Sequence, residues 1–174
     1  KMFSDCSSLK SLEIPNIETD KIKDFSSLFC NCNSLERLDL SSFKTNSATS
    51  MFHMFENCYS LKYLDVSSFN SESVKNMEKM FFNCSSLTTL NLYSFDTKSV
   101  ENMLDMFSGC ISMKYLDLSG FNTESVINMG SMFTECHSLT SVNLDNFDTS
   151  KVTNFAHMFN NCFSLTSLDI GHFN

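Results

Sequence analysis

The most regular feature of the chain is a set of apolar positions that recurs every 26 residues, with no insertion or deletion between Met2 and Phe173. When Lys1 is numbered as repeat position 1, positions 2, 3, 6, 9, 12, 14, 17, 22 and 25 are apolar in every copy. The 174 residues then form six complete copies and part of a seventh, which we number coils 1 to 7. A fixed period predicts coils stacked along one axis, because each coil can bury its apolar edge only against its neighbours.

Two patterns within each copy predict its elements. Positions 12 to 14 read apolar, polar, apolar, as in Leu38–Leu40 and Leu90–Leu92, which predicts a short strand. From position 22 into the next copy, apolar residues follow at offsets 0, 3, 6, 7 and 10, as in Val74–Cys84, which is a helical stripe. We therefore expect a right-handed α/β repeat solenoid with a parallel β-sheet on one face and short helices on the other.

The ends of the expected helices also have candidate residues. Position 19 is Thr or Ser in all six copies, which suggests an N-cap. Position 5 is Asn or Gly in five of the seven copies, which suggests a left-handed C-cap, with Asp5 and Glu135 as the departures.

The repeat accounts for the composition, which includes 18 Phe, 11 Met, 8 Cys and no Trp. Asp and Glu total 20 against 12 Lys and Arg, and Arg37 is the only arginine, so nucleic acid is excluded as a partner. No apolar run approaches the roughly 20 residues that span a bilayer, so we expect no direct membrane insertion by this segment.

Candidate catalytic and metal-binding residues do not form the patterns that chemistry requires. Seven of the eight cysteines occupy position 6 on the apolar stripe, so we expect buried thiols, and Cys30 with Cys32 forms only a CxC pair. Position 8 is Ser in every copy, but no general base recurs beside it. The histidines, which are too scattered to form a site, are His53, His137, His157 and His172. We therefore predict no enzyme activity, no catalytic residues, no metal site and no cofactor.

The repeat motif resembles a known family. Residues 32–45 read Cys-x-Ser-Leu-x-x-Leu-Asp-Leu-Ser-x-Phe-x-Thr, and residues 74–81 read Val-x-Asn-Met-x-x-Met-Phe. These strings are similar to the BspA-like leucine-rich repeats of bacterial and protist surface proteins, in the 26-residue variety found in bacterial lipoproteins. The resemblance implies a leucine-rich-repeat module at the cell surface or outside the cell, with a role in adhesion or protein binding. Its motif residues are scaffold residues, so it identifies no ligand.

The outward positions of the expected sheet are the candidate binding surface. Coils 3 and 5 both read Lys-Tyr-Leu-Asp, and exposed Tyr and Arg are the residue types that carry binding energy at interfaces. The predicted contact residues, which would form one patch for a protein or other surface ligand, are Arg37, Lys62, Tyr63, Asp65, Lys114, Tyr115 and Asp117.

Several alternatives remain open at this stage. The tyrosines could simply stabilise cross-strand neighbours, and the acidic column at position 13 could bind cations or only keep the sheet hydrated. Apolar residues outside the repeat columns, such as Phe52, Phe82 and Phe163, could form a second contact strip. The whole module could also be purely structural, assembling with other chains or spacing other domains.

The organisation expected for residues 1–174 is one solenoid that is a fragment of a longer array. The chain begins and stops inside a repeat, and neither end shows a polar capping copy. Uncapped coils would expose core positions, so we also expect association with neighbouring chains through these ends.

Overall fold

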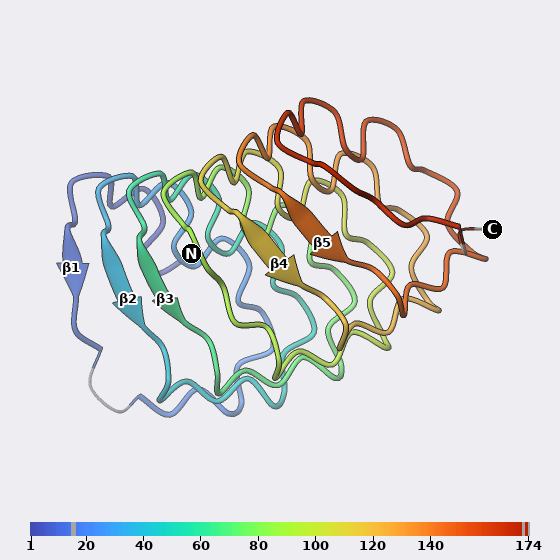
Figure 1. Cartoon of the computed structure of the whole chain (residues 1–174). Helices are drawn as coiled ribbons and strands as arrows, with labels where there is room; N and C mark the ends of the chain where they lie inside the picture. The colour runs from blue at the N-terminus through green and yellow to red at the C-terminus, as the bar shows by residue number, and fades with distance from the viewer. Residues whose placement is uncertain (15–16, 172, 174) are drawn as a thin grey trace.

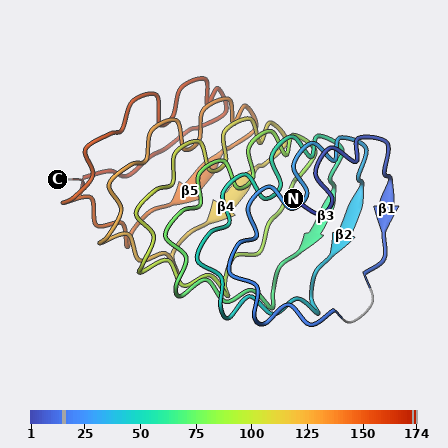
Figure 2. The same cartoon turned by 180° about the vertical axis from the view of Figure 1, so that it is seen from behind.

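The computed structural model describes residues 1–14, 17–171 and 173, and it shows a right-handed solenoid of stacked coils (Figure 1). The strands share one direction on the face nearest the viewer, the chain returns behind them, and each coil lies beside the previous one. The view from behind shows the return segments as a second wall (Figure 2). The predicted repeat solenoid is therefore correct.

The strands are short and parallel, and they form two separate sheets. They are β1 (Ser11–Leu12), β2 (Arg37–Asp39), β3 (Tyr63–Asp65), β4 (Tyr115–Asp117) and β5 (Ser141–Asn143). One sheet has the order β1-β2-β3 and the other consists of β4 and β5. Paired residues are 26 positions apart, as in Leu38 with Leu64, so the repeat sets the register. Each three-residue strand begins one residue before the predicted position, because the polar residue at position 11 also joins the ladder.

Coil 4 corrects the prediction of a strand at Leu90–Leu92, because the structure has no strand there. Within the part of the chain that the structure describes, no hydrogen bond joins the backbone of residues 88–91 to coil 3 or coil 5. Leu92 is nevertheless buried as the pattern requires. The apolar pattern thus fixes which side chains face the core, whereas a strand also requires neighbouring backbones within hydrogen-bonding distance.

The opposite wall corrects a second prediction, since none of the described residues is helical. None of the described segments could therefore cross a membrane as a helix. On this wall, some backbone N–H groups donate to carbonyls of the next coil, and others donate to carbonyls of their own turn. The N–H of Phe29 donates to Met54 of the next coil at 2.9 Å, and that of Cys32 donates to Phe29 of its own turn at 3.2 Å. A helix would satisfy both within one segment, so this wall is a stack of turns joined by hydrogen bonds between coils.

Left-handed residues explain why the apolar stripe does not form a helix. The backbone has positive φ at position 1, as at Ser27 (55°), and at position 5, as at Asn31 (61°). Each lies third in a hydrogen-bonded four-residue turn, which is the signature of a type II turn. Two such residues per coil interrupt any right-handed helix. The prediction of a left-handed residue at position 5 is confirmed, even for Asp5 (65°) and Glu135 (62°), but that residue shapes a turn.

The Thr and Ser residues at position 19 are not helix N-caps, because no helix follows them. These residues are buried, and in coils 1 to 5 their hydroxyl groups bond the backbone of the next coil instead. Thr97 Oγ1 donates to the carbonyl of Asn122 at 2.8 Å and accepts from its N–H at 2.9 Å. These hydroxyls therefore fix the stacking of coils where no strand or turn does so.

The core is a series of single-residue columns. Phenylalanines at position 3 stack from Phe3 to Phe159 with ring centroids 5.2–5.8 Å apart and ring planes within 12° of parallel. Beside them, the thiols at position 6 are free and most are buried, as in Cys84, whose Sγ donates to the carbonyl of Phe55. Burial raises the pKa of Cys110 to about 12. The cysteines of this column thus pack as small apolar side chains, as expected from their place on the apolar stripe.

The side chains at position 5 form a directional amide ladder. The amide Nδ2 of Asn57 donates to Oδ1 of Asn31 at 2.8 Å, and Asn31 donates to Asp5 at 2.7 Å. Asn83 joins by donating to Asn57 at 2.9 Å. Coil 5 has Gly109 at this position, where a Cβ would lie 2.1 Å from Oδ1 of Asn83. A second run starts in coil 6, where Asn161 donates to Glu135.

Candidate binding surface on the sheet face

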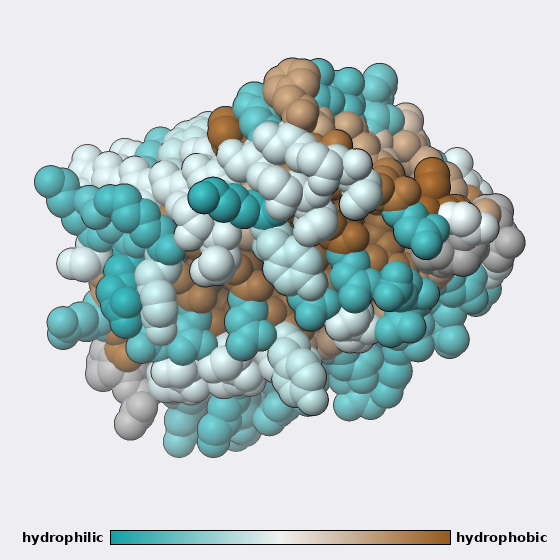
Figure 3. Space-filling view, viewed as in Figure 1, coloured by the Kyte–Doolittle hydropathy of each residue, from teal (hydrophilic) through white to brown (hydrophobic). Residues whose placement is uncertain are grey.

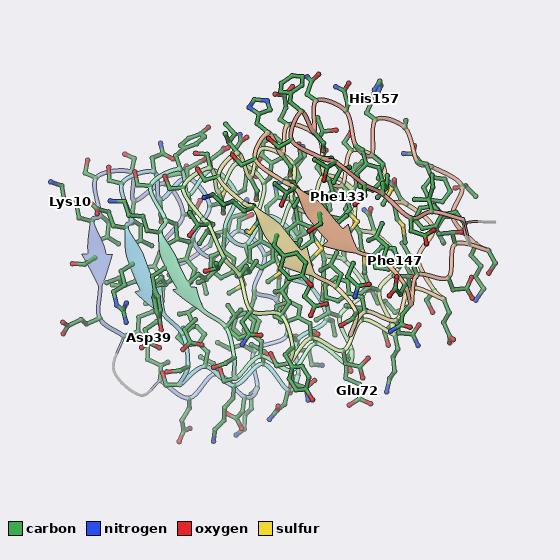
Figure 4. All side chains as sticks on the ribbon, in the orientation of Figure 1. Lys10, Asp39, Glu72, Phe133, Phe147 and His157 are labelled. Carbon is green, nitrogen blue, oxygen red and sulfur yellow. The ribbon has the colours of Figure 1, made fainter. Side chains whose placement is uncertain are left out.

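The outward side chains of the strands form polar rows along the solenoid axis. Figure 4 shows Lys10 and Asp39 at opposite ends of the strand region, and Phe133 and Phe147 inside the solenoid. In Figure 3 the same face carries hydrophilic and neutral side chains, with hydrophobic surface visible between them. The candidate residues of the strands lie on this face because they alternate with a buried core residue.

The candidate residues of coils 2 and 3 contact one another. The guanidinium carbon of Arg37 lies 3.7 Å from the ring centroid of Tyr63. Lys62 Nζ forms an ion pair with Glu36 at 2.9 Å. The Tyr63 hydroxyl donates to Asp65 Oδ2 at 3.4 Å. Most of the interacting groups in this cluster are thus already engaged within the protein.

The candidate residues of coil 5 lie beside a hollow. Lys114, Tyr115 and Asp117, together with residues 88–91 of coil 4, line a space of about 570 Å³. Tyr115 is 51% exposed. Among the described residues, the Lys114 ammonium has no ion-pair partner. In contrast to coil 3, these side chains are open to a ligand.

The seven predicted contact residues therefore form two groups on either side of coil 4. The split in the sheet lies between them, because residues 88–91 pair with neither neighbour. Six of the seven are exposed, and Asp65 is half-buried. Their role in binding stays a prediction.

The acidic column at position 13 has a local role that the two earlier alternatives did not include. Asp39 Oδ1 accepts the backbone N–H of Ser41 at 3.0 Å, and Asp117 accepts that of Ser119 at 3.0 Å. Hydrogen bonds from the serine hydroxyl and backbone lower the pKa of Asp39. These are Asx turns that end the strands, and Asn serves equally well, as Asn143 does at the end of β5. The described residues contain no group of three side chains that could hold a metal ion.

The histidines of coils 3 and 6 bond nearby carboxylates. His53 Nδ1 lies 2.5 Å from Glu56 Oε2, and its Nε2 lies 3.7 Å from Glu78. His137 Nε2 lies 2.6 Å from Glu135. His172 lies outside the described residues.

Sequence reasoning missed three residues that shape the candidate surface. Glu36 pairs with Lys62, whereas Thr88 and Thr89 occupy the equivalent positions 10 and 11 in coil 4 and leave the hollow. A comparison of each coil with the one before it in the repeat would have revealed this difference.

In the proposed apolar strip, Phe52 packs edge-on against His53, and Phe82 is covered in part by Lys79. Phe163, in contrast, is 75% exposed.

The chain matches a family model along its whole length. The model is described as "Mycoplasma protein of unknown function, DUF285", and it matches residues 1–115 and again residues 83–174. A search of curated proteins found none that matches.

The chain is also similar to solved structures of longer proteins. A leucine-rich cell surface protein from Faecalibacterium prausnitzii is 22% identical over 82% of this chain and 41% of its own, with a TM-score of 0.49. A leucine-rich repeat protein from Bacteroides ovatus is 19% identical over 76% of this chain and 39% of its own, with a TM-score of 0.46. This chain thus spans about two-fifths of either structure. Both descriptions name leucine-rich proteins.

Proposed function

Since the chain belongs to the DUF285 family, whose description states no function, we propose a function from the surface that it presents. The chain is a non-enzymatic leucine-rich-repeat module of the cell surface that binds a protein ligand through its sheet face. The cell-surface part of the proposal comes from the resemblance of the repeat motif to surface proteins.

The exposed tyrosines of the sheet face carry this proposal. Tyr63 is 40% exposed and Tyr115 is 51% exposed, on strands whose opposite side chains are almost completely buried. The core is filled by the Phe, Met, Leu and Cys columns, so packing does not require these rings. Large, rigid aromatic side chains on a stiff support are typical binding hot spots. Lys and Asp residues flank both rings and can supply the polar contacts of an interface.

The proposal is tested by attaching the chain to beads and measuring retention on a panel of purified extracellular proteins. We expect retention on at least one protein, and a loss of about tenfold or more in the double variant Tyr63→Ala and Tyr115→Ala. These side chains bury little core area, so the melting temperature should change little. The matched control is Lys75→Ala with Thr153→Ala, which removes exposed side chains from the other wall.

The rival role is a structural spacer, which needs no recognition surface. Retention that is equal in the sheet-face variant and in the control variant would contradict the proposal and favour the spacer. Retention by none of the proteins would do the same.

A further inference from the structure

Coils 3 and 5 carry the same outward residues but receive different neighbours. In coil 3, Lys62 pairs with Glu36 and the Tyr63 ring lies under Arg37, both supplied by coil 2. In coil 5, Lys114 and Tyr115 occupy the same repeat positions. Coil 4 offers them Thr88 and Thr89 in place of the acid and the arginine.

The Tyr115 ring therefore lacks the covering guanidinium, and Lys114 lacks the carboxylate partner, that coil 2 supplies to coil 3. Thr89 has neither the length nor the charge to cover the ring of Tyr115, which stays exposed beside the hollow of about 570 Å³. Thr88 carries no carboxylate, and Lys114 has no ion-pair partner among the described residues. The hollow is open to solvent, so a ligand side chain can enter it from the surface.

We propose that this hollow is the anchor point of the protein ligand, and that it takes an arginine and a carboxylate side chain from one exposed segment of that ligand. The arginine stacks on Tyr115 as Arg37 stacks on Tyr63, and the carboxylate pairs with Lys114 as Glu36 pairs with Lys62. This inference rests on the proposed function, and it names the chemistry that the sheet face would recognise.

The surroundings of the hollow favour a guanidinium in particular. The backbone carbonyls of residues 88–90 accept no hydrogen bond from neighbouring coils, so they are free to accept N–H donors. Asp117 is an exposed carboxylate at the edge of the hollow, and its Oδ1 accepts the N–H of Ser119 in its Asx turn. A guanidinium is planar and presents five donors, so it can stack on a ring and bond these oxygens together, which an ammonium cannot do.

The first test uses the capped peptide Gly-Glu-Arg-Gly as the probe, with calorimetric titration of the folded chain. We expect saturable binding that is weakened about tenfold or more by Tyr115→Ala and by replacing the peptide arginine with lysine. Tyr59→Ala is the matched control, because Tyr59 is a 43% exposed tyrosine outside the hollow, and it should leave the affinity unchanged. Absence of binding, or equal affinity in the Tyr59 and Tyr115 variants, would overturn the inference.

The second test fills the hollow from within the chain. The double variant Thr88→Glu and Thr89→Arg places the residues of coil 2 in coil 4, and it should abolish peptide binding. The same pair of changes in coil 7, Thr166→Glu with Ser167→Arg, adds identical charges two coils away from Tyr115 and should leave binding intact. Peptide binding that survives in the filled variant would overturn the inference. Retention on a panel protein without any peptide binding would leave the proposed function standing and remove only this inference.

Discussion

Coil 4 is joined to its neighbours in opposite ways on the two walls of the solenoid. On the turn wall, the N–H of Phe81 donates to Met106 at 3.0 Å and that of Asn83 donates to Ser108 at 2.8 Å. On the sheet face, the backbone of residues 88–91 makes no such bond in either direction. The stack therefore keeps its register through the turn wall, and it does not need a continuous sheet.

The two walls also differ in the continuity of their backbone pairing. Isolated parallel bridges at position 24 run without a break from Asp24 to Asn154. On the sheet face, positions 10 and 11 change from coil to coil, and the ladder stops where they become Thr88 and Thr89. The turn wall therefore holds the stack through its backbone in every coil, whereas the sheet face is not needed for stacking in coil 4.

Hydrogen exchange would test this comparison most directly. Amide protons of residues 88–91 should exchange near their intrinsic rates, because no acceptor protects them. Those of Phe81 and Asn83 should exchange about 10³-fold more slowly or beyond, because they are released only when the coils separate. The measurement is exchange followed by NMR at each residue. Similar protection of both segments would show that the sheet is closed in coil 4 and would remove the contrast.

Truncation of the phenylalanine column should have the largest effect on stability. Phe81 is fully buried between Phe55 and Phe107, at centroid distances of 5.6 Å from each. Phe81→Ala should lower the free energy of unfolding by about 3–5 kcal/mol, through lost burial and a cavity. Urea denaturation measures the change, and Phe163→Ala, at a residue that is 75% exposed, is the control. Equal losses in both variants would contradict the assignment of the column as the main core.

A single methyl group at position 5 of coil 5 should have an intermediate effect. Gly109 has a φ of 74°, and a Cβ there would meet Oδ1 of Asn83 at 2.1 Å. Gly109→Ala should therefore cost about 1–2 kcal/mol of stability. A Cβ at Gly120 would meet no atom within 4 Å, so Gly120→Ala is the matched control on the sheet side and should be nearly neutral. Thermal melts measure both changes. A larger loss of stability for Gly120→Ala than for Gly109→Ala would contradict the close packing assigned to position 5.

The smallest expected effect on stability concerns Glu135, which begins the second run of the amide ladder. Hydrogen bonds from Asn161 and His137 lower the pKa of Glu135 below its ordinary value of 4.5. Because the folded-state pKa is depressed, the stabilisation is present above the unfolded pKa and is lost as the pH falls through the folded value. Between pH 7 and pH 3, wild-type stability should fall slightly more than that of Glu135→Gln in urea melts. Glu124→Gln, at an exposed glutamate, is the control, and an identical pH dependence in all three proteins would exclude a contribution from Glu135.

The sequence was sufficient to predict which residues face the core. The 26-residue period placed Phe81, Cys84 and Leu92 inside, and all three are buried. It also placed the start of each strand to within one residue wherever a strand forms. These features follow from the alternation of apolar and polar positions, which is a property of side chains alone.

The turn wall could not be predicted from the same pattern. Position 1 has a positive φ at Ser27, His53 and Lys79, and these residue types give no sign of a left-handed conformation. Offsets of 3 and 4 fit a helix and a stack of four-residue turns equally well. The hydrogen bonds between coils decide for turns, and they depend on residues 25 positions away.

The candidate surface was predictable as a set of residues but not as a set of contacts. Repeat positions 10, 11 and 13 identified Tyr63 and Tyr115 as outward residues. That Arg37 covers the first ring, while the second stays open, depends on the rotamer of a side chain in the preceding coil. Such contacts appear only when successive coils are placed side by side.

The amide ladder sets an order in which coils can follow one another. An asparagine at position 5 both donates and accepts, so Asn57 can follow Asn31, and Asn83 can follow Asn57. A carboxylate only accepts, so it can begin a run, as Asp5 and Glu135 do, but directly after Asn83 it would place oxygen against oxygen. Gly109 separates the two runs because it brings no side chain to the junction. The coils therefore cannot be exchanged freely. If whole repeats are duplicated or deleted, each position 5 side chain must still meet a donor, an acceptor or a glycine that suits it in the neighbouring coil.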